Sequence, residues 1–295
     1  MREIVDAHHH LWDKAALPYP WLQGPPFPTM VVGDVTAIAG NYLVDDFRAD
    51  TANYRLTGSV HIDGGTPERI GETAWLQPIA DREGLPSAIV AGAQLHQPDI
   101  EAFLEEQASF PAVRGVRHIL NWDPDPSVTF INRPDLMTDP AWLKGYAALA
   151  RHDMSFDLQV YPWQLPGAAE VAAKFPAIPM ILNHTGMPLH QHNMGLETWK
   201  NGMRKFAAVP NTSVKISGLG MVDWQWSVDS IRPLVLETID IFGPERCMFA
   251  SNFPVDRLFG SFDETYAAFE TIVAGFSEAE QHAMFAENAR RIYRL

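Results

Sequence analysis

This chain of 295 residues has one cysteine, no long apolar run and few basic side chains. The single Cys247 excludes an internal disulfide and favours a reducing compartment. It lies in the apolar run 247–250, so we interpret it as a buried thiol rather than a nucleophile. No apolar stretch approaches the roughly 18 residues of a membrane span, and no signal-peptide core follows the first residues. We therefore expect a cytoplasmic protein with no membrane partner.

The scarcity of positive charge excludes a further class of partner. The chain has 22 Lys and Arg against 36 Asp and Glu, a net charge of −14. Such an acidic surface argues against binding to nucleic acid or to an anionic membrane. The 46% share of hydrophobic residues is enough for a large core. We expect the partner to be a small-molecule substrate.

Short apolar runs alternate with longer amphipathic segments along the whole chain. Eight strands alternating with eight helices predict a parallel sheet, and the number favours a (β/α)8 barrel over an open doubly wound sheet. We predict an α/β fold with one distorted TIM-barrel domain over residues 1–295. Strands are expected at roughly 4–10, 57–62, 88–94, 114–120, 155–161, 178–183, 212–217 and 247–251, and helices near 44–54, 67–84, 98–110, 139–152, 165–175, 195–208, 227–242 and 261–275.

Three segments read as insertions after strands, and the first of them, rich in Pro, Gly and aromatic residues, lacks helical periodicity. Residues 13–43 follow the first strand, 121–138 the fourth and 184–194 the sixth. All three extend from strand C-termini, the face on which barrel enzymes build their active sites. We therefore predict that these insertions shape a substrate pocket.

The C-terminal region carries helix-start signals. Ser261 with Glu264, and Ser277 with Glu280, are typical of capping boxes. We expect a closing helix within 277–295.

The most informative local pattern is a His-x-His pair at the end of the first strand. Residues i and i+2 of a strand share one face, so His8 and His10 can converge on one metal ion or substrate oxygen while His9 points away. The alternatives are a histidine-rich strand end without a ligand and the remnant of an affinity tag. The position directly behind Ile4-Val5 argues against a tag.

Most other histidines also fall at strand ends. A barrel active site gathers such residues at its C-terminal rim, whereas chance would scatter them. Only His152 and His282 fall in predicted helices. The nine at strand ends or in the following loops are His8, His9, His10, His61, His96, His118, His184, His190 and His192.

Further polar side chains end the predicted strands. Each has a structural alternative: a basic residue can pair with a carboxylate, a Tyr can pack in the core, and a His can bond a backbone carbonyl. We predict that several contact substrate or reacting atoms. They are Arg117, Gln159, Tyr161, Lys215, Asn252 and Asp256, together with His61 from the second strand.

These motifs, in this order, resemble the amidohydrolase superfamily. They are most similar to its lactonase branch, which includes the 2-pyrone-4,6-dicarboxylate, L-fucono-1,5- and L-rhamnono-lactonases. The resemblance spans the whole chain and implies a distorted (β/α)8 barrel with hydrolysis at the C-terminal face. The matching segments are 6–12, 115–118, 156–161, 183–188, 215–218 and 248–256.

The resemblance assigns His8 and His10 to strand 1, His184 to strand 6 and a carboxylate to the end of strand 8. The chain departs from this pattern because Asn252 stands where the superfamily usually has Asp. An amide cannot accept a proton at neutral pH. Three alternatives stay open: Asp256 is the base, a neutral imidazole is the base, or the substitution is inactivating.

The cofactor prediction follows from the same residues. Strand 5 ends in Gln159 and Tyr161, where many metal-dependent members have His, which argues against a binuclear metal site. We expect no organic cofactor, and either no required metal or one divalent ion, preferably Zn²⁺, on His8, His10 and His184.

The predicted reaction is hydrolysis of a sugar-acid, muconolactone-type or pyrone-type lactone. The three histidines, or their metal, would polarise the carbonyl, Arg117 would bind a substrate carboxylate or hydroxyl, and Lys215 would assist. One alternative is a metal-dependent decarboxylase or C–C hydrolase, and another is a barrel that only binds a ligand. Apolar loop tips such as Trp21 and Phe27 are compatible with a homo-oligomer contact or a pocket lid.

Overall fold

The computed structural model describes residues 1–23, 31–189 and 195–295. Its eight strands are parallel and lie side by side in chain order. A parallel bridge between His9 and Phe253 joins the first strand to the segment after the last, which confirms the predicted barrel. The strands are β1 (Glu3–His9), β2 (Arg55–Ile62), β3 (Ala88–Gly92), β4 (Val113–Ile119), β5 (Ser155–Gln159), β6 (Met180–Leu182), β7 (Thr212–Ile216) and β8 (Cys247–Phe249).

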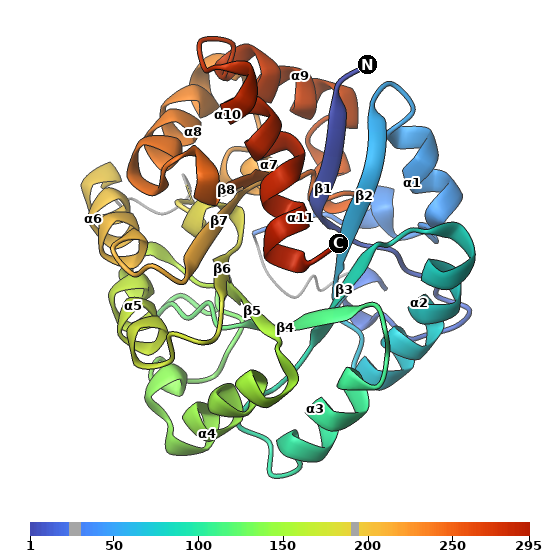
Figure 1. Ribbon diagram of the computed structural model, residues 1–295, viewed down its shortest axis with the longest axis vertical. Helices are drawn as coiled ribbons and strands as arrows, with labels where there is room; N and C mark the ends of the chain where they lie inside the picture. Colours follow the sequence, from blue (N-terminus) through green and yellow to red (C-terminus); the bar gives the residue numbers. More distant parts are fainter. Residues whose placement is uncertain (24–30, 190–194) are drawn as a thin grey trace.

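The helices form a ring around the strands, seen along the barrel in Figure 1. The predicted helices are present with shifted ends, and the structure adds the short α7, which is too short to show a periodicity. No helix within the described ranges is long and apolar enough to cross a membrane. The helices are α1 (Val44–Asp50), α2 (Arg69–Glu83), α3 (Ile100–Ala108), α4 (Pro140–Ala148), α5 (Leu165–Lys174), α6 (Leu196–Ala207), α7 (Leu219–Val222), α8 (Val228–Phe242), α9 (Phe262–Ile272), α10 (Glu278–His282) and α11 (Asn288–Tyr293).

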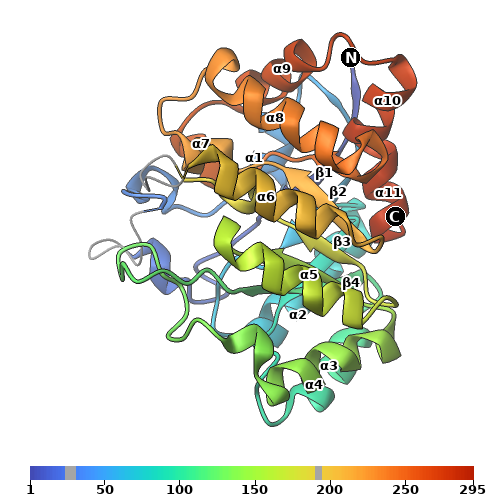
Figure 2. The same cartoon turned by 90° about the vertical axis from the view of Figure 1, so that its left-hand side faces the viewer.

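The two ends of the barrel differ, as Figure 2 shows from the side. The insertion after β1 and the short α7 lie at one end, whereas α10, α11 and both termini lie at the other. Both predicted capping boxes are formed, with Ser261 and Ser277 accepting the backbone N–H of Glu264 and Glu280. The expected closing helix consists of α10, a π-helical turn over Ala283–Glu287, and α11.

The interior of the barrel combines apolar side chains with a polar region. Val5, Val60 and Val90 pack with Tyr293 and other residues of the closing segment. On β5 and β7 the interior positions are instead Asp157 and Lys215, both fully buried. These two side chains form a polar region within the interior that is stabilised by charge pairing rather than by apolar packing.

Asp157 is the centre of that polar region. Its carboxylate accepts hydrogen bonds from Lys215 Nζ at 2.5 Å, from Asn183 Nδ2 at 3.0 Å and from Tyr293 OH at 2.9 Å. These partners come from β7, the end of β6 and α11, so one side chain links three elements. Burying a charge is costly unless it is paired and hydrogen-bonded, and here both conditions are met.

A second buried carboxyl group fastens the insertion after β1. Glu72 Oε1 on α2 accepts the backbone N–H of Gly64 at 2.9 Å and the hydroxyl of Tyr19 at 3.2 Å. Burial, together with the nearby charge of Asp63, raises the pKa of Glu72 to about 8. Glu72 is therefore mostly protonated in the folded protein at neutral pH.

Removing the charge of Asp157 should strongly destabilise the fold. Asp157→Asn leaves the Lys215 ammonium buried without its counter-ion, and we expect a loss of about 3–5 kcal/mol in the free energy of unfolding. The double variant Asp157→Asn/Lys215→Met should lose less than the sum of the single variants. Denaturant unfolding measures both. Asp153→Asn, whose side chain is 84% exposed, is the matched control. An Asp157→Asn variant within 1 kcal/mol of the parent would contradict this role.

Replacing Glu72 by Gln should make stability less dependent on pH. The folded-state pKa is raised from 4.5 to about 8, so its contribution is complete below 4.5 and is lost as pH rises through 8. Glu72→Gln keeps the acceptor oxygen without titrating. Between pH 6 and pH 9 its melting temperature should therefore fall by a few °C less than that of the parent, on the order expected for a chain of this size. Parallel curves for the two proteins would argue against a raised pKa; the exposed Glu278→Gln is the control.

Candidate active site

A cavity of about 250 Å³ lies at the C-terminal ends of the strands. This is the end where the sequence predicted a site. Its polar walls come from β4, β5 and the segments after β1, β2, β6 and β8, and its apolar walls come largely from the insertions. The polar lining residues are His10, Asp63, Arg117, Gln159, His184 and Asn252, and the apolar ones include Trp21, Val31, Val32, Phe130, Met187 and Met221.

Three of the predicted histidines lie together, and two of them, His10 and His184, line this cavity. The ring of His8 lies next to both others, with centroid distances of 5.1 Å to His10 and 4.5 Å to His184. All three are buried, and burial lowers the pKa of each below its usual value. The three imidazoles are therefore neutral at pH 7 and keep a nitrogen lone pair.

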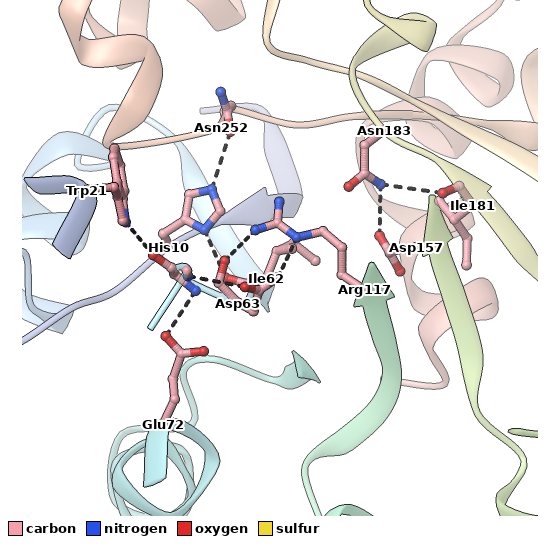
Figure 3. A network of polar contacts seen from close by, with 12 residues as sticks. His10, Trp21, Ile62, Asp63, Glu72, Arg117, Asp157, Ile181, Asn183 and Asn252 are labelled. Atoms are coloured by element: carbon pink, nitrogen blue, oxygen red, sulfur yellow. Dashed lines mark hydrogen bonds and ion pairs between the residues drawn. The ribbon is translucent and has the colours of Figure 1, made fainter. Parts of the chain in front are cut away.

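The hydrogen bonds of His10 fix its tautomer. Nδ1 lies 2.8 Å from the carbonyl oxygen of Ile62, which can only accept, so Nδ1 carries the proton. Burial lowers the pKa of His10 to about 4, which leaves a lone pair on Nε2. Figure 3 shows Nε2 facing Asn252, whose Oδ1 is 3.4 Å away. Two acceptors facing each other are complementary to a donor or a cation placed between them.

The other two imidazoles differ in their partners. Neither ring nitrogen of His8 has a hydrogen-bond partner in the described part of the chain, although both are buried. His184 Nδ1 lies 3.0 Å from Ser217 Oγ. His184 has a φ of 55°, in the left-handed region that L residues rarely adopt. A Cβ added to Gly218 would lie 2.5 Å from Nδ1 of His184, so only a glycine at position 218 leaves space for the imidazole.

Asn252 is held from behind by Asp256. Asn252 Nδ2 donates to Asp256 Oδ1 at 2.8 Å, while Gly220 N–H approaches the other carboxylate oxygen at 3.4 Å. Burial raises the pKa of Asp256 to about 7. Asp256 does not line the cavity, whereas Asn252 does. The predicted role of Asp256 as a base in contact with substrate is therefore not supported by its position, because the amide stands between.

Arg117 lines the cavity as predicted, held in place by Asp63. Its Nε donates to Asp63 Oδ2 and its Nη2 to the Asp63 carbonyl, both at 2.5 Å. Figure 3 shows these two contacts, and the third guanidinium nitrogen, Nη1, forms no hydrogen bond with any residue in the described ranges. Arg117 can thus donate one further hydrogen bond into the cavity without losing its orientation.

Three predicted site residues are turned away from the cavity, which corrects the prediction. Lys215 is paired with Asp157 inside the barrel. His61 is buried with Nε2 3.2 Å from the carbonyl of Leu11, because its strand neighbours Val60 and Ile62 take the interior face. Tyr161 OH donates to the carbonyl of Val128 at 2.5 Å, and so fixes the insertion after β4.

The remaining histidines do not join the cluster. His9 stacks on Phe47 at 4.0 Å, on the outside of the barrel, as the strand alternation predicted. His118 stacks on His96 at 5.8 Å, away from the other rings. His190, His192 and Phe27 lie outside the described residues.

Two site residues escaped the sequence analysis. Asp63 directly follows β2 and orients Arg117, and Glu72 supports the backbone at Gly64, next to it. The position of Asp63 at a strand end was a usable signal. Glu72 lies within a helix, where nothing in the sequence marks it as buried.

The donor set suits a divalent cation in its chemistry. Neutral imidazoles suit Zn²⁺, the two nitrogens of His8 lack partners, and His10 donates its other N–H to a carbonyl, as metal-bound histidines do. Within residues 1–23, 31–189 and 195–295 no three His, Cys, Asp or Glu side chains are already grouped around one point. The donors therefore fit a cation chemically, and the imidazoles would have to turn toward it.

Comparisons with known proteins agree with this geometry. The chain is 44% identical to the protein y4mH of Sinorhizobium fredii, over 99% of this chain and 98% of that one. It is 28% identical to an L-fucono-1,5-lactonase of Burkholderia multivorans, over 99% and 96%. The crystal structure of an amidohydrolase from Burkholderia multivorans with bound Zn superposes with a TM-score of 0.82, at 28% identity over 99% of both chains.

The family assignment follows from the match along the sequence. The amidohydrolase family matches residues 5–295, which include every strand end described above. The predicted resemblance is confirmed, and the chain belongs to the amidohydrolase family.

Proposed function

We propose that this protein hydrolyses a lactone, with water attacking the carbonyl carbon of a cyclic ester. The observation that carries the proposal is a cluster of three neutral imidazoles at the strand C-termini, two of which, His10 and His184, line one cavity together with Arg117. Lactonases that align over almost the full chain support the same reaction. A sugar-acid lactone is the preferred substrate class.

The side chains divide the work between them. Arg117 donates to a substrate oxygen through its free nitrogen and sets the position of the ring. His8, His10 and His184 would hold one divalent cation, which when bound would polarise the carbonyl and make water more acidic. Asn252, fixed by Asp256, presents its amide oxygen beside His10 and orients a donor there. Trp21, Met187 and Met221 keep bulk water from the reacting ester.

The direct test is acid release from a panel of lactones, followed with a pH indicator. We expect turnover on at least one sugar lactone, muconolactone or pyrone carboxylate. If no lactone is hydrolysed, the proposal is wrong. Release of CO₂ from aromatic or β-keto acids would then support the decarboxylase alternative.

Replacing His184 should abolish most of the activity while the fold remains. Asn is the better substitute, because it tolerates the left-handed backbone at this position more readily than Ala. We expect His184→Asn to lower kcat at least about 100-fold, the size of effect typical of an acid–base or polarising group. The melting temperature should stay close to that of the parent. His152→Asn, outside the cavity, is the control; near-parental turnover in His184→Asn would remove this residue from the mechanism.

Chelation should test the proposed cation. We expect dialysis against a chelator to remove about one equivalent of divalent metal and the turnover with it, and added Zn²⁺ or Mn²⁺ to restore both. Elemental analysis gives the stoichiometry independently of activity. Full turnover after complete metal removal would instead mean that the imidazoles act directly, with the lone pair of His10 Nε2 as the proton acceptor.

A further inference from the structure

A second cavity adjoins the active-site cavity and has no role in the proposed reaction. Its volume is about 540 Å³, and it lies beside the N-terminus of α2 and the end of β3. The two cavities share six lining residues, so they meet across a common boundary. The shared residues are Trp21, Asp63, Gly65, Arg117, Ile119 and Phe130.

Among the polar side chains that line the second cavity but not the first, His118 and Gln94 each offer a hydrogen-bond donor, whereas the hydroxyl oxygen of Thr66 accepts the backbone N–H of Glu68. The side chain of His118 is buried, with 7% of its surface exposed. Its Nδ1 accepts a hydrogen bond from Trp142 Nε1 at 3.1 Å. An indole N–H can only donate, so the proton of the neutral imidazole is on Nε2. Gln94 Oε1 accepts from Gln97 Nε2 at 2.6 Å, which leaves the amide nitrogen of Gln94 as a donor.

Arg69 adds an unpaired positive charge. It is the first residue of α2 and lines the cavity, and its guanidinium forms no ion pair with any residue in the described ranges. The undescribed segments 24–30 and 190–194 contain no Asp or Glu that could pair with it. The N-terminus of the 15-residue α2 adds partial positive charge at the same place.

The one carboxylate among the lining residues is already neutralised. Asp63 Oδ2 is bound to Arg117 Nε at 2.5 Å, and its Oδ1 accepts the backbone N–H of Gly65 at 3.1 Å. With that pair closed, Arg69 is the net charge of the cavity. A guanidinium without an ion-pair partner in the described ranges and two neutral donors, on Gln94 and His118, line the same cavity and are together complementary to a carboxylate.

We propose that Arg69, Gln94 and His118 bind a carboxylate that the substrate carries outside its lactone ring. This inference rests on the proposed function and narrows its substrate class to acidic lactones. The ring would occupy the first cavity against Arg117, and the acidic substituent would extend past Trp21 and Phe130 into the second.

Kinetics on a matched pair of lactones test this specificity. D-saccharic acid 1,4-lactone and D-glucono-1,4-lactone differ only in a carboxylate in place of a primary alcohol. Arg69→Gln should lower kcat/KM for the acidic lactone at least about 10-fold more than for the neutral one, as loss of a charge-assisted hydrogen bond predicts. Arg204→Gln, on the outer helix α6, should change neither. An equal fall on both lactones, or none on either, would overturn the proposal.

Calorimetric binding of the open-chain acids separates this inference from the proposed function. The parent should bind D-saccharate at least about 10-fold more tightly than D-gluconate, and Arg69→Gln should lose that preference. If the parent prefers D-saccharate but hydrolyses no lactone, the carboxylate subsite stands and the proposed reaction is refuted. If it hydrolyses lactones without preferring D-saccharate, the reaction stands and the subsite is refuted. Acetate binding that depends on Arg69, with no preference for saccharate, would reassign the cavity to a separate carboxylate ion and overturn the substrate assignment.

Discussion

The buried ion pair between Asp157 and Lys215 is the constraint on which the barrel interior depends. Two charges without access to water require each other, and Tyr293 OH from α11 completes the shell around the carboxylate. The closing segment thus contacts the buried ion pair as well as the apolar residues of the barrel interior. The same pair explains why Lys215 does not act in the cavity, because its ammonium group neutralises Asp157 inside the barrel.

That arrangement also influences the chemistry above it. Burial is the main reason that the pKa of His8 is low, and the positive charge of Lys215 lowers it further. Arg117 has the same effect on His10 and His184. The fold therefore keeps all three imidazoles neutral at pH 7, and neutral imidazoles are the form that can bind a cation or accept a proton. Catalytic capacity and barrel stability share the same buried charges.

The insertion after β1 completes the cavity because side chains anchor it to the barrel. Trp21 Nε1 donates to the carbonyl of Gly64 at 2.8 Å, and Tyr19 reaches Glu72. These bonds place Trp21 on the boundary between the two cavities. The indole of Trp21 thus forms part of the wall of both cavities.

The sequence by itself determined the barrel and the rim on which its chemistry lies. Strand alternation and the order of elements are local patterns, and they correctly brought His8, His10, Arg117 and Asn252 to one end of the sheet. Only the tertiary structure decided which polar side chains reach the cavity. Lys215 meets a partner 58 residues away, and Asp256 is shielded by Asn252. Which side chains reach the cavity depends on which buried groups form hydrogen bonds and ion pairs across the closed barrel. The alternation of side chains along one strand carries no information about those partners.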